Sequence, residues 1–135
     1  MRVVFDTNIL VSALLTPGGT CERAVRFAIR GALRPFVDSR LVAEYESVLY
    51  GSELRFPSEA ADELLDGLKA RATVVTAPPL PARLPHAADL PFLEVAATAQ
   101  ALLVTGNLRH FPKRQRAGVR VVTPGELLDL LRERA

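Results

Sequence analysis

The stretch Val3-Val4-Phe5-Asp6-Thr7-Asn8 decides the fold that is predicted for this chain. Three apolar residues run into an aspartate, a threonine and an asparagine, and an apolar segment with helical spacing follows at residues 9–15. A short, wholly apolar run that ends in a polar turn is typical of a central strand in a parallel sheet covered on both faces. Ligands bind such sheets at the carboxyl ends of the strands. Asp6 is therefore predicted to stand where a reaction would take place.

Length and composition favour one packed globular domain. The chain has 135 residues, 49% of them hydrophobic and 24% charged, so residues 1–135 are expected to form a single domain around one core. The formal net charge of +2, from 17 Lys and Arg against 15 Asp and Glu, is too small to indicate nucleic-acid binding by itself. The one cysteine, Cys21, excludes an internal disulfide and a cysteine-cluster zinc site.

The sequence gives no sign of export or of a membrane partner. The chain enters a strand at once, without a charged leader and a long apolar segment, so no secretory signal is expected. No apolar run approaches the length that crosses a bilayer. A cytoplasmic protein is therefore expected.

Apolar patterns along the rest of the chain alternate between strands and helices. Helical spacing indicates helices at residues 9–15 and 40–50, and further helices that begin near residues 20, 58, 89 and 124. Short runs at residues 34–37, 73–76, 102–105 and 120–123 indicate strands, and the proline-rich segment 77–85 a connector. Such alternation implies right-handed crossovers, and hence a three-layer α/β/α sandwich around a central, mainly parallel sheet of four to five strands.

Polar residues ahead of these helices are candidates for N-caps. Thr20, Asp38 and Ser58 each precede an apolar helical pattern, and side chains of these types accept hydrogen bonds from the first free N–H groups of a helix. We therefore expect all three to be capping residues.

Few carboxylates fall at predicted strand ends or at helix starts. If the strands are parallel, Asp6, Glu44, Asp89 and the amide Asn107 converge at one edge of the sheet from distant parts of the sequence. Carboxylates that are held together repel each other unless they are protonated or neutralised by a cation. An oxygen-lined acidic pocket without Cys or His ligands suits Mg²⁺ or Mn²⁺ rather than zinc.

The two aspartates have a structural alternative. Asp6 could merely cap the helix that follows it, which is the commoner role of an isolated aspartate at a strand-to-helix turn. Asp89 stands just ahead of a helix that starts with a proline, where the exposed N–H groups and the helix dipole favour an acid. Spacing alone favours a cap for Asp89, whereas the apolar strand before Asp6 favours function.

Three further positions are ambiguous by pattern. Glu44 and Glu46 border the apolar face of the helix at 40–50 almost symmetrically, and periodicity does not choose between them. Asn107 follows a glycine, which is typical of a turn residue with a left-handed backbone. Ser12 is typical of a neutral residue on a helix surface.

Four motifs in order give the chain a resemblance to a known family. VVFDTNILVSALL at 3–15, SRLVAEYESVL at 39–49, ADLPFLEVA at 88–96 and LLVTGNLRHFP at 102–112 together resemble the PIN domain. The branch that they most resemble contains the toxin components of toxin-antitoxin systems, which are relatives of the VapC toxins. The resemblance covers nearly the whole chain and implies a PIN-like fold.

The resemblance implies a set of acidic site residues. Asp6, Glu44 and Asp89 match the three acids that are catalytic and bind metal in the family, which selects Glu44 over Glu46 by analogy. Asn107 stands where many members have a fourth acid, so it is expected as a metal ligand that lacks the negative charge. This departure leaves open whether one or two metal ions bind.

The family also implies supporting residues, an activity and partners. Asn8 and Ser12 match the polar residues that accompany the first acid, and Thr105 is expected to line the same pocket. The implied activity is a ribonuclease that uses Mg²⁺ or Mn²⁺ to hydrolyse RNA phosphodiester bonds. The implied partners are an RNA substrate, a cognate antitoxin protein and a second copy of the chain.

A basic window lies next to the last motif. Its residues Arg109, His110, Lys113 and Arg114 could hold an RNA backbone beside the acidic centre, with salt-dependent binding. A solvated loop explains the same residues equally well.

Two other classes of function compete with the nuclease. A phosphatase of the haloacid dehalogenase-like kind also begins with apolar residues and an aspartate, but normally has a second aspartate where this chain has Asn8. The other alternative is a catalytically silent PIN-like module that binds RNA or a protein, which Asn107 favours and the three retained acids oppose.

Overall fold

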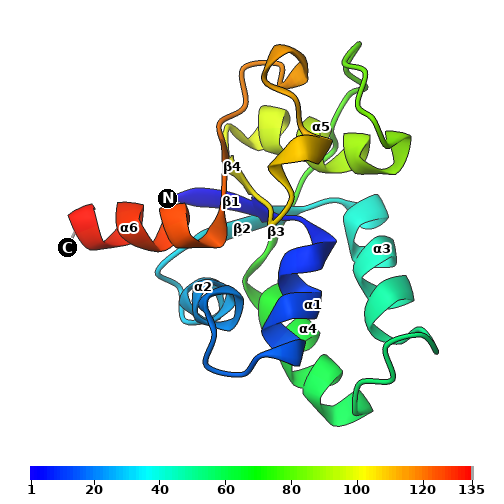
Figure 1. Cartoon of the computed structure of the whole chain (residues 1–135), viewed down its shortest axis with the longest axis vertical. Helices are drawn as coiled ribbons and strands as arrows, with labels where there is room; N and C mark the ends of the chain where they lie inside the picture. Colours follow the sequence, from blue (N-terminus) through cyan, green and yellow to red (C-terminus); the bar gives the residue numbers. More distant parts are fainter. Residues whose placement is uncertain (135) are drawn as a thin grey trace.

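The computed structural model describes residues 1–134, and a five-stranded sheet runs through the middle of the fold (Figure 1). Every neighbouring pair of strands is parallel. The strands lie in the order β3-β2-β1-β4-β5, where β1 is Arg2–Phe5, β2 is Arg34–Val37, β3 is Thr73–Val74, β4 is Leu102–Val104 and β5 is Val121–Val122. The predicted α/β/α sandwich with a parallel sheet is confirmed, although β3 and β5 are shorter than predicted.

Six α-helices surround the sheet. They are α1 (Thr7–Leu15), α2 (Thr20–Ile29), α3 (Ser39–Leu49), α4 (Ser58–Arg71), α5 (Leu90–Ala99) and α6 (Pro124–Arg134). Helix α5 covers one side of the sheet, and α1, α2 and α4 lie on the other side (Figure 1). None of the helices within residues 1–134 is long and apolar enough to span a bilayer.

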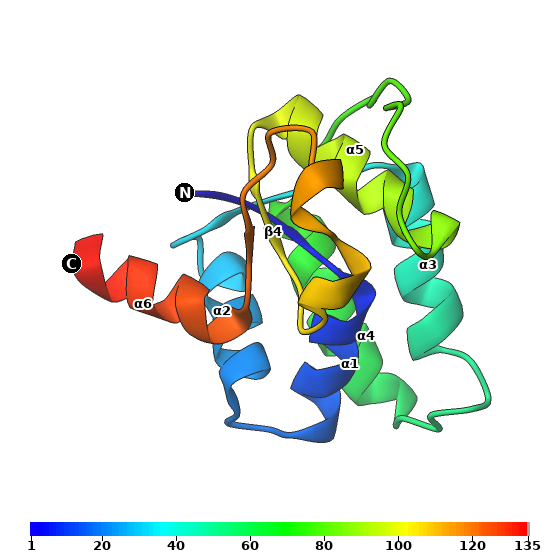
Figure 2. The same cartoon turned by 45° about the horizontal axis from the view of Figure 1, so that its top comes forward.

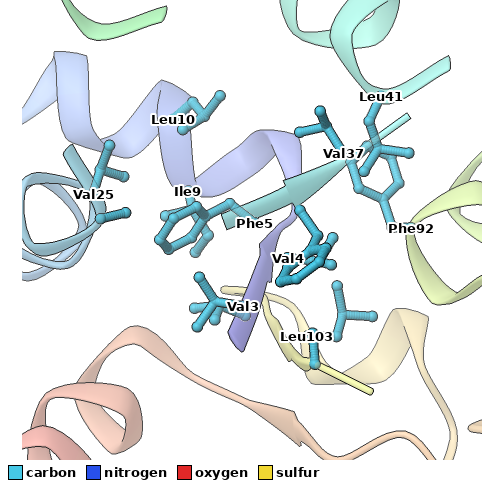
Figure 3. Close-up of a cluster of buried hydrophobic side chains, with 14 of the residues drawn as sticks. Val3, Val4, Phe5, Ile9, Leu10, Val25, Val37, Leu41, Phe92 and Leu103 are labelled. Atoms are coloured by element: carbon cyan, nitrogen blue, oxygen red, sulfur yellow. The ribbon is translucent and has the colours of Figure 1, made fainter. Parts of the chain in front are cut away.

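Strand β1 lies at the centre, as its sequence predicts. Val3, Val4 and Phe5 are 0%, 0% and 1% exposed, and successive strand residues point to opposite faces, so both faces of β1 are covered. Side chains from α1, α2, α3, α5 and the neighbouring strands gather around them (Figure 3). Burial of this apolar surface is the main favourable contribution to the stability of the fold.

The strand order creates a switch point beside β1. From β1 the chain moves outward through β2 to β3, and it then returns to the opposite side of β1 for β4 and β5. The connections that leave β1 and β4 therefore diverge, and the crevice between them is where open parallel sheets bind ligands. Asp6 follows β1 and Thr105 follows β4, so both stand at this crevice.

One of the three predicted helix caps is confirmed. The Asp38 side chain accepts hydrogen bonds from the backbone N–H groups of Arg40 and Leu41 at 2.9 and 3.0 Å. The predictions for Thr20 and Ser58 are wrong, because both are the first residues inside their helices and the cap positions belong to Gly19 and Pro57. At α2 the Glu22 side chain reaches back to the Gly18 N–H at 2.9 Å instead.

The proline-rich connector has no helix or strand between Val75 and Pro85. It is held to the rest of the fold by backbone N–H groups, because Leu80 donates to Glu94 and Arg83 donates to Gln115, both at 2.8 Å. The connector consequently lies against α5 before that helix begins.

Candidate functional site

Helices α1, α3 and α5 approach one another at the carboxyl edge of the sheet (Figure 2). A cavity of about 270 Å³ opens there. Its wall contains residues from four separate parts of the sequence, among them Asp6, Asn8, Glu44, Asp89 and His110. A larger cavity of about 450 Å³ lies at the opposite edge of the sheet, and no acidic residue lines it. Of these two cavities, the smaller one is the cavity that acidic residues line within residues 1–134.

Asp6 does not act as a helix cap. It occupies the N-cap position of α1, but its side chain makes no capping hydrogen bond. Its Oδ2 instead accepts a hydrogen bond of 2.8 Å from the hydroxyl of Thr105, whose oxygen in turn accepts the Asn107 N–H at 3.0 Å. The side chain is therefore oriented by the end of β4, which argues against the capping interpretation.

The Asp6 carboxyl lies in an environment that disfavours its charge. The residue is only 5% exposed. Burial is the largest cause of a raised pKa at Asp6, the Thr105 hydrogen bond acts in the opposite direction, and repulsion from Asp89 raises the pKa further. A cation bound between Asp6 and Asp89 would offset both the cost of burying the Asp6 charge and the repulsion between the two carboxylates.

Asp89 also fails to cap its helix. It precedes α5 with a helical backbone, and its side chain makes no capping hydrogen bond. His110 Nδ1 lies 2.9 Å from Asp89 Oδ2, which forms an ion pair when the imidazole is protonated, and this buried oxygen accepts no well-formed hydrogen bond. Buried carboxylate oxygens normally have a hydrogen-bond partner, and an unsatisfied one is a candidate ligand atom.

Glu44 reaches the cavity from α3. Pattern could not separate it from Glu46, but Glu44 lines the cavity, whereas Glu46 is not among its lining residues within the described chain. The next residue, Tyr45, is 1% exposed and donates a hydrogen bond of 2.6 Å to the carbonyl of Phe5. This contact holds α3 against the end of β1, directly before Asp6.

The remaining predicted pocket residues differ in their placement. Asn8 lines the cavity and accepts a hydrogen bond of 3.3 Å from the Gly106 N–H. Thr105 is fully buried behind Asp6. Ser12 lies on α1, which packs against α2, and of residues 1–134 neither Ser12 nor Thr105 belongs to the cavity wall.

Asn107 is placed differently from its predicted turn conformation. Its φ is −133°, so the left-handed backbone expected after Gly106 is not formed. Its backbone N–H supports Thr105, and its side chain is not part of the cavity wall in the described residues. Asn107 therefore acts on Asp6 through Thr105 in this arrangement.

The four predicted RNA-binding residues divide into two groups. His110 lines the cavity, and its ring packs at a tilt of 42° against His86, with 4.3 Å between the ring centroids. Arg109, Lys113 and Arg114 are exposed on the short 3-10 helices η2 (Leu108–His110) and η3 (Lys113–Gln115). Of the four predicted residues, His110 is the one that lines the cavity within residues 1–134.

Sequence reasoning missed a group of residues that support the cavity. Tyr45, Phe92, Arg40 and Glu94 hold α3 against the end of β1 and against α5. A signal was present at Glu94, which is a lone acid inside the otherwise apolar stretch from Phe92 to Ala99. A buried carboxylate in such a place needs a cationic partner.

The donor set fits Mg²⁺ or Mn²⁺ by its chemistry. No three His, Cys, Asp or Glu side chains within residues 1–134 are placed so that they could hold one metal ion together. The cavity wall nevertheless carries three carboxylates and an amide, and two of its buried oxygens, Asp89 Oδ2 and Thr7 Oγ1, have no hydrogen-bond partner. Oxygen donors of this kind suit hard cations rather than zinc.

Comparisons with known proteins agree with the fold and the motifs. Residues 2–109 match the family model described as "PIN domain". No curated protein matches the chain by sequence. The fold is similar to a chain of VapBC2 from Rickettsia felis bound to a DNA fragment from their promoter, with a TM-score of 0.63 and 18% identity over 91% of this chain and 98% of that chain. It is also similar to a chain of VapBC-1 from nontypeable Haemophilus influenzae, with a TM-score of 0.61 and 17% identity over 93% and 99% of the two chains.

Proposed function

Because this chain belongs to the PIN domain family, we propose that it is a metal-dependent endoribonuclease that hydrolyses RNA phosphodiester bonds. The observation that carries the proposal is the gathering of Asp6, Glu44 and Asp89 in one cavity at the switch point of the sheet. Asp6 follows β1, Asp89 ends the short 3-10 helix η1 (Ala87–Asp89), and both precede an α-helix, yet neither uses its carboxylate as a cap. Asp38, which does cap its helix, lies outside this cavity.

In this proposal the three carboxylates and Asn8 hold Mg²⁺ or Mn²⁺, with Asn107 as a further candidate ligand. A bound divalent ion supplies a lowered pKa for the attacking water and positive charge opposite the scissile phosphate. Thr105 fixes the orientation of Asp6, and Tyr45 fixes the position of α3 relative to the end of β1. Ser12 is the one proposed pocket residue that supports the site from a distance, through the contact between α1 and α2.

RNA is proposed to bind along the segment that follows β4. Arg109, Lys113 and Arg114 are exposed and would contact backbone phosphates, while His110 lies at the cavity mouth. Such contacts position a strand without reading its sequence, because phosphates are the same at every nucleotide. An RNA backbone bound in this way would lie beside the acidic centre.

The cellular role that we propose is that of a toxin in a toxin-antitoxin pair. The likeness to chains of VapBC complexes supports the fold, and it motivates a cognate antitoxin that covers the cavity. A cytoplasmic location, a single domain over residues 1–135 and a homodimer complete this proposal. Co-expression with the product of a small neighbouring reading frame, followed by co-purification, tests the antitoxin.

The test of the activity compares two glutamates on one helix. Purified wild type, Asp6→Asn, Glu44→Gln and Glu46→Gln are incubated with a mixed single-stranded RNA in Mn²⁺ and in EDTA, after removal of host nucleases. Glu44 and Glu46 are both exposed on α3, but only Glu44 lines the cavity. We expect cleavage that requires Mn²⁺, is lost in Asp6→Asn and Glu44→Gln, and is kept in Glu46→Gln.

A second candidate function is a silent binding module, and one observation favours it. Asp89 Oδ2 lies against His110, and no three acids of residues 1–134 are preassembled around a metal position. If wild type and Asp6→Asn are equally inactive, and neither binds Mn²⁺, the nuclease proposal is wrong and this module becomes the better account. Binding of labelled RNA by both proteins would then identify the module's ligand.

A further inference from the structure

Arg40 joins α3, which carries Glu44, to α5, which begins directly after Asp89. We propose that Arg40 is a positioning residue that fixes α3 against α5 and thereby sets the affinity of the cavity for a divalent cation. This inference rests on the proposed function, because it assigns a role to Arg40 only if Glu44 and Asp89 share a metal ion. It adds a residue that touches neither the cation nor the RNA.

The contacts of Arg40 reach both helices. Its Nε and Nη2 lie 2.9 and 2.7 Å from Asp38 Oδ2, at the N-terminus of α3. Its Nη1 donates a hydrogen bond of 2.7 Å to Glu94 Oε1, on α5. The planar guanidinium therefore holds two carboxylates at once, which the ammonium of a lysine does not do with the same geometry.

The partner on α5 is a buried carboxylate. The Glu94 side chain is 3% exposed, and its second oxygen accepts a hydrogen bond of 2.8 Å from the Leu80 N–H. Both oxygens are thus satisfied, one by Arg40 and one by the connector. A shift of α3 along α5 that separates Arg40 from Glu94 leaves this buried charge without its cationic partner, which is costly.

The Arg40–Glu94 pair lies one helical turn from the site. Arg40 precedes Glu44 by four residues, so the two side chains share one face of α3. Glu94 follows Asp89 by five residues at the start of α5. The same two helices also meet through Tyr45 and Phe92, whose ring centroids are 6.2 Å apart.

These two contacts constrain the helix pair in different ways. Apolar packing between Tyr45 and Phe92 holds the helices together, but it has little directional preference. The hydrogen-bonded pair of Arg40 and Glu94 is directional, so it fixes how far α3 slides along α5. Removing groups that support ligands from outside the coordination sphere typically weakens metal binding by about 10- to 100-fold.

The positioning role and simple electrostatics predict opposite changes in Mn²⁺ affinity when Arg40 is removed. Arg40 is a positive charge near an acidic cavity, so its removal alone would tighten the binding of a cation. Loss of the positioning contact would weaken the same binding. The direction of the change in Mn²⁺ affinity therefore distinguishes the two roles.

The experiment uses a control arginine with the same exposure. Arg40→Gln is compared with Arg26→Gln, because the side chain of Arg26 is also 44% exposed and also pairs with an acid, Glu22, but it lies on α2 away from the cavity. Mn²⁺ binding is measured from the electron paramagnetic resonance signal of free Mn²⁺ at a temperature well below the melting transition, which is recorded for each variant. We expect the Kd for Mn²⁺ to rise about tenfold in Arg40→Gln and to stay unchanged in Arg26→Gln.

Two further measurements complete the test. Arg40→Lys keeps the charge but not the two-sided geometry, so its Kd should lie between those of wild type and Arg40→Gln. For RNA cleavage, the Mn²⁺ concentration at half-maximal rate should rise while KM for RNA is unchanged. An unchanged or lower Kd in a folded Arg40→Gln variant overturns the inference. If the wild type still cleaves RNA in that case, the proposed function stands. A wild type that does not bind Mn²⁺ overturns both the inference and the proposed function.

Discussion

The hydroxyl of Tyr45 donates a hydrogen bond of 2.6 Å to the carbonyl of Phe5, and each of these two residues is the sequence neighbour of an acid that lines the cavity. Phe5 is followed by Asp6 at the end of β1, and Tyr45 is preceded by Glu44 on α3. The pair is 40 residues apart in sequence and buried. It therefore fixes the end of β1, which precedes Asp6, against α3, which carries Glu44.

Removing this hydroxyl should destabilise the protein. In Tyr45→Phe the buried Phe5 carbonyl loses its partner, so we expect the free energy of unfolding to fall by about 1 to 2 kcal/mol. The matched control is Tyr50→Phe, because the Tyr50 hydroxyl also donates to a partner, Asp62, but on the protein surface. Urea denaturation should show a much smaller change for the control, and equal changes in the two variants would contradict the role of Tyr45.

The raised pKa of Asp6 has a consequence for stability. The folded state holds the proton of Asp6 more tightly than the unfolded state, whose pKa is near the ordinary value of 3.8. This contribution to stability is therefore present at low pH and is lost as pH rises from 3.8 through the raised pKa of the folded state. At neutral pH the ionised, buried Asp6 costs free energy in the metal-free protein.

Asp6→Asn removes that cost and keeps an oxygen that can accept the Thr105 hydrogen bond. We expect metal-free Asp6→Asn to melt at a higher temperature than wild type at pH 7, and the difference to shrink as pH approaches 3.8. Added Mn²⁺ should raise the melting temperature of wild type more than that of the variant. A variant that is less stable than wild type at neutral pH would show that the charge of Asp6 is already compensated.

The basic segment after β4 should control salt-dependent RNA binding. Neutralising Arg109, Lys113 or Arg114 one at a time should weaken binding of unrelated RNA sequences alike and reduce the slope of log Kd against log salt by about 1 each. The control is Arg132→Gln, whose exposed side chain lies on α6, far from this segment (Figure 1). Fluorescence anisotropy in EDTA separates binding from cleavage, and equal effects at all four positions would contradict a local RNA surface.

Gln100 offers a stabilising substitution away from the site. It ends α5 with a φ of 52° and a ψ of 48°, a left-handed conformation that glycine adopts without strain. We expect Gln100→Gly to raise the free energy of unfolding by up to about 1 kcal/mol, because relief of strain outweighs the added freedom of the unfolded chain. Urea denaturation measures the gain, and cleavage of RNA should be unchanged because Gln100 lines the cavity at the opposite edge.

The sequence by itself determined the layers of the fold and the order of its elements. The apolar run at residues 3–5 predicted a central, doubly covered strand, and Asp38 predicted a helix start that its side-chain hydrogen bonds confirm. These features are local or periodic, so neighbouring residues are enough to specify them. The four motifs added the family, to which residues 2–109 belong by their match.

Local patterns were less informative about the cavity. Asp6 and Asp89 both had capping as a plausible role, and Glu44 could not be separated from Glu46 by periodicity. The tertiary structure resolved these alternatives in space, because capping bonds are absent from both aspartates and Glu44 is the glutamate of this pair that lines the cavity. Which of these carboxylates bind a metal stays a prediction.

Only the tertiary structure decided how the elements that carry the cavity's acids are held together. The contacts of Tyr45 with Phe5 and of Arg40 with Glu94 join residues 40 and 54 positions apart. Hydrophobic periodicity specifies which face of a helix is buried, but the position of one helix along another depends on side chains that meet only after packing. The acids could therefore be read from the sequence, whereas the contacts that set their spacing could not.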